Sequence, residues 1–237
     1  MNKIFLGLAL LGLSLQANAQ DAWTIGQVEV QPFDRIIVTR GLDVDIQMGD
    51  THEVEIQTLN MPNDAIFVKQ RGNTLIMGIK WKNLLRYAKD TDHVDTEVKI
   101  IVPRLTYLRL KLGGESTLEG PLTGEEFAVK VGGASILVIT DLQVDNFYAK
   151  VRGAAELTVS GEAKEQKVYV RGASTYHGTD LVTEYTQVWA RGASEGHVQA
   201  YGWLKATARG ASDIYYVTEP KVEDLLSTGA SEIMASK

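Results

Sequence analysis

Hydrophobic and polar positions alternate along most of the chain after residue 106, and this alternation predicts β-strands. The strings FAVKV, ELTVS, KVYV and TQVWA are rich in Val, Thr and aromatic residues, which favour strands over helices. Apolar residues at every second position are typical of a strand that buries one face and exposes the other. The segments between the strings lack helix-forming residues, so we expect an all-β protein.

Each strand-like string ends in a four-residue motif, and the seven copies read GGES, GGAS, RGAA, RGAS, RGAS, RGAS and TGAS. The glycines at the second position of the motif recur at intervals of 18 to 20 residues. They are Gly114, Gly133, Gly153, Gly172, Gly192, Gly210 and Gly229. A short fixed period filled by strands indicates a repeat architecture in which every copy is one structural unit.

Columns in the alignment of the copies predict which side chains face inward. Apolar residues stand four and two residues before the glycine and again four residues after it. The sets are Leu110, Val129, Ala149, Val168, Val188, Ala206, Leu225; Leu112, Val131, Val151, Val170, Ala190, Ala208, Ser227; and Leu118, Leu137, Leu157, Tyr176, Gly196, Ile214, Ile233. The positions between them are mostly polar, so we expect one buried face and one exposed face in every coil.

These observations predict a single-chain parallel β-solenoid with coils of about 19 residues, and we expect the coils to be right-handed. Like residues would then stack at the strand spacing of ~4.8 Å. The motif glycine would adopt the positive φ of a corner, and the serine after it would bond inward to the carbonyl groups of the corner.

The predicted domain organisation follows from where the repeat begins. Residues 1–19 form a predicted signal peptide, with Lys3, an apolar run and the small-residue cleavage string Ala17-Asn18-Ala19. Residues 20–237 form one solenoid domain. Within it, 20–105 are less regular N-terminal coils with a polar excursion at 82–97, for which we expect one short helical turn, and 106–237 are the seven Gly-Ala-Ser coils. In the N-terminal part Leu42, Val44 and Ile46 are expected to face inward, and Asp43 and Asp45 outward.

Composition narrows the function classes. The chain has no cysteine, which excludes disulfides, thiolate metal sites and a cysteine-linked lipid anchor. Loss of Lys3 with the signal peptide leaves 23 basic and 30 acidic residues, a net charge of −7 that does not favour nucleic acid as a partner. We expect an exported protein of the periplasm, cell surface or medium, without a transmembrane segment and not a lipoprotein.

The candidate binding residues lie on the outward positions of successive coils. Arg152, Arg171, Arg191 and Arg209 precede the motif glycine, and Tyr169 and Trp189 lie two residues before the arginines. An acidic column, made of Glu156, Glu195, Asp213 and Glu232, is expected beside the arginines as an ion-pair ladder that fixes the register of the coils. A ligand surface is the second interpretation of the arginines. For the aromatic residues, two interpretations remain open: ligand binding, and packing against the segment 82–97 or a neighbouring subunit.

Two further chemistries are weaker. His177 and His197 lie on adjacent coils and are weak metal candidates, because two ligands fall short of the usual three or four. We therefore expect no metal and no cofactor. A row formed by Glu195, Asp213 and Glu232 raises the alternative of a β-helix polysaccharide lyase or hydrolase. We expect no enzyme, because no nucleophile elbow, phosphate loop or His-Glu metal motif is present.

The segments FDRIIVTRGLDVDIQMGD and VKIIVPRLTYLRLKLGGES and the serial Gly-Ala-Ser copies resemble the head GIN domain family of auto-transporter adhesins, common in secreted proteins of Bacteroidetes-type bacteria. The resemblance implies a signal peptide, a β-solenoid-like fold, a surface or periplasmic location and a role in adhesion. The expected function is an exported binding protein whose repeated outer face contacts an extracellular or envelope glycan or protein. A structural envelope protein, forming a homo-oligomer through its coil ends, is a further alternative.

Overall fold

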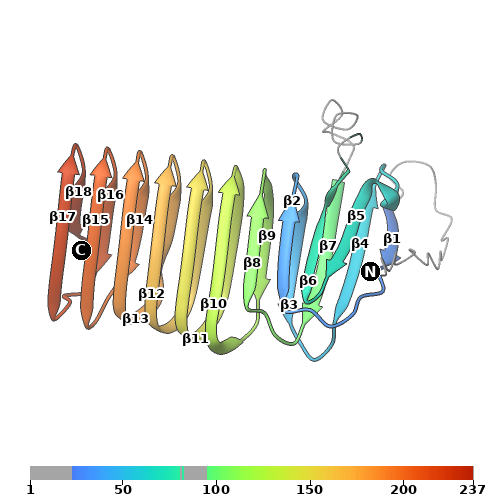
Figure 1. The fold of residues 1–237 in the computed structure, drawn as a ribbon, viewed down its shortest axis with the longest axis horizontal. Coiled ribbons are helices and arrows are strands. Elements are labelled where there is room, and N and C mark those ends of the chain that lie inside the picture. The colour runs from blue at the N-terminus through green and yellow to red at the C-terminus, as the bar shows by residue number, and fades with distance from the viewer. Residues whose placement is uncertain (1–22, 81, 83–94, 237) are drawn as a thin grey trace.

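The computed structural model describes residues 23–80, 82 and 95–236, and it consists of one β-sheet wound into a flat solenoid (Figure 1). The predicted all-β parallel solenoid is confirmed, with about 20 residues between equivalent positions of successive coils. The predicted signal peptide at 1–19 and residues 83–94 of the predicted excursion lie outside the described residues.

The strands fall into an N-terminal and a repetitive part. The N-terminal elements are β1 (Trp23–Gln27), β2 (Arg35–Thr39), β3 (Asp43–Met48), β4 (Glu53–Leu59), the 3-10 helix η1 (Asn63–Ala65), β5 (Ile66–Arg71), β6 (Thr74–Ile79) and β7 (Asp95–Val102). The repetitive elements are β8 (Tyr107–Lys111), β9 (Gly114–Glu119), β10 (Leu122–Gly133), β11 (Ser135–Gly153), β12 (Glu156–Gly172), β13 (Thr175–Gly192), β14 (Glu195–Gln199), β15 (Trp203–Gly210), β16 (Asp213–Val217), β17 (Val222–Gly229) and β18 (Glu232–Ala235).

Each repetitive coil contributes to two layers that enclose the core. We call front sheet the layer that faces the viewer in Figure 1, formed by β2, β6, β8, the C-terminal parts of β10–β13, β15 and β17. The back sheet is formed by β3, β7, β9, the N-terminal parts of β11–β13, β14, β16 and β18. The chain rises in the front sheet, turns at the motif glycine and descends in the back sheet, so these two halves of one coil face opposite sides.

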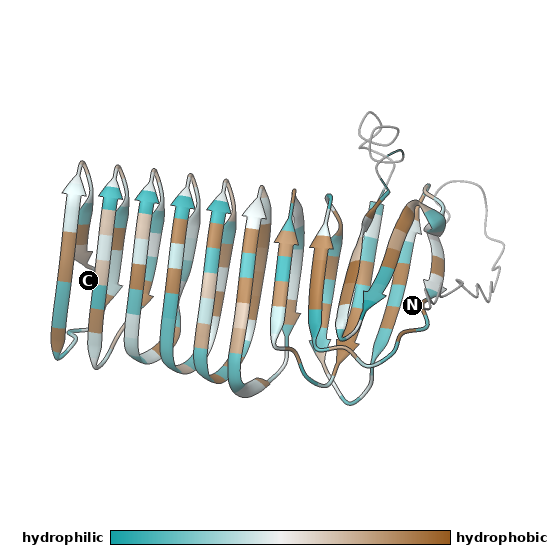
Figure 2. Ribbon diagram, in the orientation of Figure 1, coloured by the Kyte–Doolittle hydropathy of each residue, from teal (hydrophilic) through white to brown (hydrophobic). Residues whose placement is uncertain are grey.

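The predicted inward columns form the core of the repetitive part. Val129, Val168 and Val188 have no exposed surface, and Val151 and Val170 in the second column are equally buried. Stacking the same small apolar residue in successive coils fills the narrow space between the two sheets without voids. Figure 2 shows the resulting alternation of hydrophobic and hydrophilic positions along the strands.

The corner between the two sheets explains the repeated glycine. Six motif glycines, from Gly133 to Gly229, lie in register and have φ between +81° and +103°. A Cβ added at Gly172 would lie 2.7 Å from the carbonyl oxygen of Gly153, so only glycine fits this stacked corner. The serine that follows bonds inward as predicted: Ser212 Oγ donates to the carbonyl oxygen of Arg209 at 2.7 Å.

The first motif copy departs from this register, and two predictions for it are wrong. Gly114 pairs with Ser135, so it belongs to the serine column and not to the glycine column. The corner position of this coil is taken by Leu112, which has φ +67° and is 66% exposed instead of inward. The reason is that β8 ends at Lys111, one step earlier than the later front strands end, so the corner forms before the Gly-Gly pair.

The N-terminal end of the solenoid is closed by antiparallel pairs. β4 pairs antiparallel with both β7 and β1, and β5 pairs antiparallel with β6. The predicted excursion at 82–97 is too long at its C-terminal end, because Asp95–Val102 already form β7. In β7 the polar residues Asp95 and Glu97 occupy outward positions, which obscured the alternation of the strand in the sequence. Leu42, Val44 and Ile46 are buried as predicted, with Asp43 and Asp45 on the outer side.

Candidate binding face

The four arginines of the motif form a column on the outer surface of the front sheet. Arg152, Arg171, Arg191 and Arg209 pair in register on four successive coils, and all four side chains are exposed. None of them forms an ion pair with another described residue, so the column presents its full positive charge to solvent.

The predicted ion-pair ladder between this column and the acidic column is wrong. Glu195 and Asp213 follow the corner, so they lie in β14 and β16 of the back sheet. Arg191 precedes the same corner and lies in the front sheet. Because the corner reverses the chain, residues on its two sides project in opposite directions, and the arginines and acids are separated by the core.

Aromatic side chains stack beside the arginines. The rings of Tyr169 and Trp189 have centroids 4.4 Å apart and planes inclined by 6°, and Tyr148 lies 5.6 Å from Tyr169 at 50°. The ammonium group of Lys150 lies 5.0 Å from the centroid of Tyr148 and 5.4 Å from that of Tyr169. The rings therefore cover one another and stiffen the face on which the cations stand.

His177 and His197 lie on the back sheet and stack as their register predicts. Their ring centroids are 5.3 Å apart, and Tyr215 continues the stack at 4.9 Å from His197. Each imidazole contacts a carboxylate of its own sheet: His177 Nε2 lies 3.2 Å from Glu156 Oε1, and His197 Nε2 lies 2.7 Å from Glu195 Oε1. The described part of the chain contains no group of three or more His, Cys, Asp or Glu side chains that could hold a metal ion.

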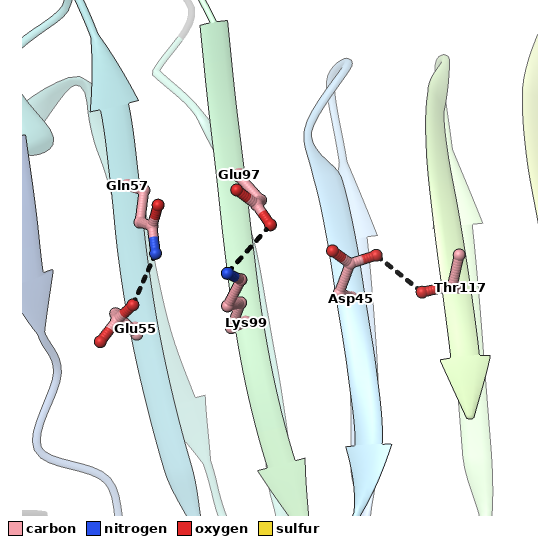
Figure 3. Close-up of polar contacts among 6 residues, drawn as sticks. All are labelled: Asp45, Glu55, Gln57, Glu97, Lys99 and Thr117. Atoms are coloured by element: carbon pink, nitrogen blue, oxygen red, sulfur yellow. Dashed lines mark hydrogen bonds and ion pairs between the residues drawn. The ribbon is translucent and has the colours of Figure 1, made fainter. Parts of the chain in front are cut away.

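Glu195, Asp213 and Glu232, the row of carboxylates that raised the lyase alternative, are in register on the back sheet. They form contacts within that sheet. Glu195 pairs with His197, and Asp213 Oδ1 accepts a hydrogen bond from the backbone N–H of Glu232 at 3.0 Å. The acidic surface continues onto the N-terminal strands of the same sheet (Figure 3), where Glu97 pairs with Lys99 at 3.3 Å and Asp45 accepts from Thr117 at 2.6 Å.

The two outer faces of the solenoid carry opposite charge, which the net charge of the chain conceals. The outward cations of the front sheet are Arg35, Arg109, Lys111, Lys130, Lys150, Arg152, Lys167, Arg171, Arg191, Lys205 and Arg209. The outward acids of the back sheet and of β4 are Asp43, Asp45, Glu53, Glu55, Asp95, Glu97, Glu115, Glu119, Glu156, Glu195, Asp213 and Glu232. The front sheet also carries acids: Glu165 and Asp224 pair with Lys167 and Lys205, and Glu126 is exposed in register with Glu165. The other cations of the front sheet stay unpaired among the described residues.

A groove runs along the bend at which each coil returns from the back sheet to the front sheet, which we call the lower bend. The sequence alone did not indicate a site there. The groove encloses about 1020 Å³ and is lined by Tyr185, Tyr201 and Trp203, with Lys164 and Glu184 at its polar positions. Tyr185 and Tyr201 are 47% and 51% exposed, and neither makes a ring–ring contact within the described residues. Tyr185 pairs with Trp203 in the front sheet, so the groove continues into the basic face. The sequence shows a high density of aromatic residues in the late coils. It does not show the bend that brings these residues together.

Comparisons with known proteins agree on fold and family. A structure described as a putative adhesin from Bacteroides fragilis superposes with a TM-score of 0.79 at 17% identity, covering 94% of this chain and all of the other. A putative lipid binding protein from Parabacteroides distasonis gives a TM-score of 0.68 at 15% identity, covering 93% of this chain and 98% of the other. A putative adhesin from Parabacteroides merdae gives 0.66 at 16% identity, covering 94% and 99%.

At sequence identities of 15–17%, the similarity to these structures shows only that the fold is shared. A search of curated proteins returned no match. Among the described residues, no helix has the length and apolar character needed to cross a membrane. Residues 32–220 match the family described as "Putative auto-transporter adhesin, head GIN domain". The chain thus belongs to the head GIN domain family.

Proposed function

We propose that this protein is an exported, non-enzymatic adhesin that contacts a surface or extracellular glycan through the outer face of the front sheet. Export is supported by the N-terminal string with Lys3, an apolar run and Ala17-Asn18-Ala19, and by the name of the family. Repeat proteins commonly bind through such extended surfaces, because each coil presents the same group at a regular spacing.

The observation that carries the proposal is the unpaired arginine column. Four guanidinium groups in register repel one another, and the acidic column that was expected to neutralise them faces the opposite side. A fold that only needed register could use neutral side chains at these positions, at lower electrostatic cost. Guanidinium groups bind carboxylates and phosphates in a planar, two-pronged geometry and also stack on flat surfaces.

The groove of the lower bend supplies the aromatic part of the same binding face. Tyr185 and Tyr201 expose large parts of their rings, and Tyr201 is held by a hydrogen bond from Gln199 Nε2 at 2.8 Å. Exposed, oriented rings give a sugar an apolar surface, and the neighbouring Lys164 and Glu184 can bond its hydroxyl groups. Tyr169 and Trp189 support this face by fixing the coils above the groove.

A glycan array with the mature chain, residues 20–237, tests the proposal. The double variant Arg171→Ala/Arg191→Ala should lose binding that the wild type shows. The matched control is Arg71→Ala/Arg104→Ala, which removes the same charge from exposed arginines outside the column. Binding that survives in the first variant, or that is lost equally in both, would refute the assignment of function to this face.

A second candidate function is assembly through the last coil, favoured by its exposed apolar residues. Val222, Leu225 and Leu226 of β17 are 54%, 40% and 45% exposed, and Met234 of β18 is 37% exposed. Among the described strands, β17 pairs only with β15 and β18 only with β16, so both leave one edge open. Open strand edges with apolar side chains are surfaces on which further strands can add.

A further inference from the structure

Six outward positions of the front sheet form a regular array near the start of the repetitive part. In one row Arg109, Lys130 and Lys150 pair in register on β8, β10 and β11. In the next row, two residues further along each strand, the positions are Lys111, Gly132 and Arg152. Five of the six positions therefore carry a cation, and the sixth carries no side chain.

The missing side chain opens a notch in the surface. A cleft of about 190 Å³ is lined by all five cations, with Gly132 at its floor. A Cβ added at Gly132 would meet nothing closer than the carbonyl oxygen of Arg152 at 3.7 Å, which is ordinary van der Waals contact. The backbone at Gly132 also lacks the positive φ of the corner glycines. Glycine is therefore not required here by the fold, in contrast to Gly133 beside it.

The cations around this notch are not neutralised by the protein. None of the five forms an ion pair with a described residue, and two of them contact aromatic rings. Lys130 Nζ lies 5.3 Å from the ring centroid of Tyr107, and Lys150 contacts Tyr148 and Tyr169. Neighbouring strands are ~4.8 Å apart, so these like charges repel unless an anion lies between them.

We propose that the notch at Gly132 binds an anionic group, carboxylate or sulfate, of an acidic polysaccharide. The cleft is the size of a single charged group with its hydration, and lysine and arginine together offer both point-charge and two-pronged contacts. This deepens and rests on the proposed function, because it names acidic sugars as the glycan class that the front sheet binds.

A linear polymer fits the surroundings of the notch better than an isolated anion. Arg152 belongs both to the notch and to the arginine column, so the positive surface continues without interruption along the solenoid axis to Arg209. A polyanion with a charge on successive sugars can follow this row and gain affinity from many weak contacts. The aromatic stack of Tyr148, Tyr169 and Trp189 lies alongside as a stiff border.

Two glutamate substitutions on opposite faces of the solenoid separate this site from general charge effects. Gly132→Glu places a carboxylate in the notch, where it pairs with the cations and excludes an anionic ligand. Val138→Glu adds the same charge at a 37% exposed position of β11 in the back sheet, away from the front sheet. Because Gly132 needs no positive φ and Val138 is exposed on a strand, both variants should fold, and circular dichroism verifies this.

The probes are dextran sulfate and unmodified dextran, which share a backbone and differ in charge, and vesicles of phosphatidylcholine with phosphatidylglycerol. We expect binding of dextran sulfate but not of dextran, weakened about tenfold or more by Gly132→Glu and little changed by Val138→Glu. Binding should also weaken as salt is raised.

Equal affinity of both variants for dextran sulfate would overturn the site, and a stronger loss in Val138→Glu would move the anion away from the notch. Preferential binding of the anionic vesicles would overturn the polysaccharide as the source of the charge. If the glycan array finds neutral sugars whose binding needs Arg171 and Arg191 but tolerates Gly132→Glu, the proposed function stands and the anion site fails.

Discussion

The rings of Tyr169 and Trp189 lie parallel on adjacent coils, with centroids 4.4 Å apart and an interplanar angle of 6°. Such contact is worth about 0.5–1.5 kcal/mol beyond the area it buries. A double-mutant cycle with Tyr169→Ala and Trp189→Ala should therefore give a coupling free energy of unfolding near 1 kcal/mol. The measurement is urea unfolding followed by circular dichroism.

A second cycle with Tyr169→Ala and Tyr201→Ala serves as the control, because these two rings make no contact with each other. Its coupling should be close to zero. Equal coupling in the two cycles would show that the stack does not stabilise adjacent coils.

The column of corner glycines predicts that one added methyl group lowers the stability of the fold strongly. Gly172 has φ +96°, and an added Cβ would lie 2.7 Å from the carbonyl oxygen of Gly153. Gly172→Ala should therefore lower the free energy of unfolding by about 2–4 kcal/mol, through backbone strain and displacement of the neighbouring coil. Gly124→Ala is the control, since its Cβ would enter open space. Similar unfolding midpoints for the two variants would contradict a steric role of the corner glycine.

The alternation and the 18–20-residue period were sufficient to predict the coils, because both are local properties of the chain. They also placed the corner serines and the inward columns correctly in the coils that turn at Gly133 to Gly210, but not in the first copy, and Leu225 and Ser227 of the last coil are exposed. Periodicity could not show that Leu112 takes the corner position in the first coil, because a leucine with φ +67° has no signature in the sequence. Nor did the outward polar residues Asp95 and Glu97 identify the strand in which they lie.

The candidate site was less predictable because its geometry depends on the direction of the chain at the corner. Arg191 and Glu195 are four residues apart, which suggested an ion pair, yet the corner sends them to opposite faces. The same reversal concentrates cations on the front sheet and acids on the back sheet, although the chain as a whole is only mildly acidic. The notch at Gly132 needs the register of three strands and is invisible to composition.

A pH dependence of stability follows from Asp43 in β3. Burial raises the pKa of the Asp43 carboxyl above its usual value of 3.8, and the charges of Asp95, Glu115 and Asp45 act in the same direction, while the hydrogen bond from the Glu115 N–H opposes them. The folded state then holds this proton to a higher pH than the unfolded state does. The ionised carboxylate destabilises the fold above the raised pKa, and the penalty disappears below the usual value.

Asp43→Asn should therefore raise the thermal unfolding midpoint at pH 7, and the amide oxygen can still accept the N–H of Glu115, which Asp43 Oδ1 accepts at 2.7 Å. The difference from wild type should vanish at about pH 3, where both states carry the proton. Asp50→Asn, at an exposed position, is the control. A gain that persists unchanged at low pH would show that charge is not its cause.

The open edge of the last coil predicts how assembly would depend on one core position. Leu225 continues the inward column after Ala206, but it is 40% exposed because no described strand pairs with the outer edge of β17. A strand added to β17 would bury Leu225, so a lysine there would leave a charge in the new core, which is costly. If assembly through this edge is a function of the protein, sedimentation velocity should show mass rising with concentration in wild type and a constant monomer in Leu225→Lys.

The control is Val182→Lys, because Val182 is 40% exposed at the lower bend, and this variant should assemble as wild type does. A wild type that stays monomeric at all concentrations, or equal assembly of the two variants, would exclude this edge and leave the basic front sheet as the interaction surface.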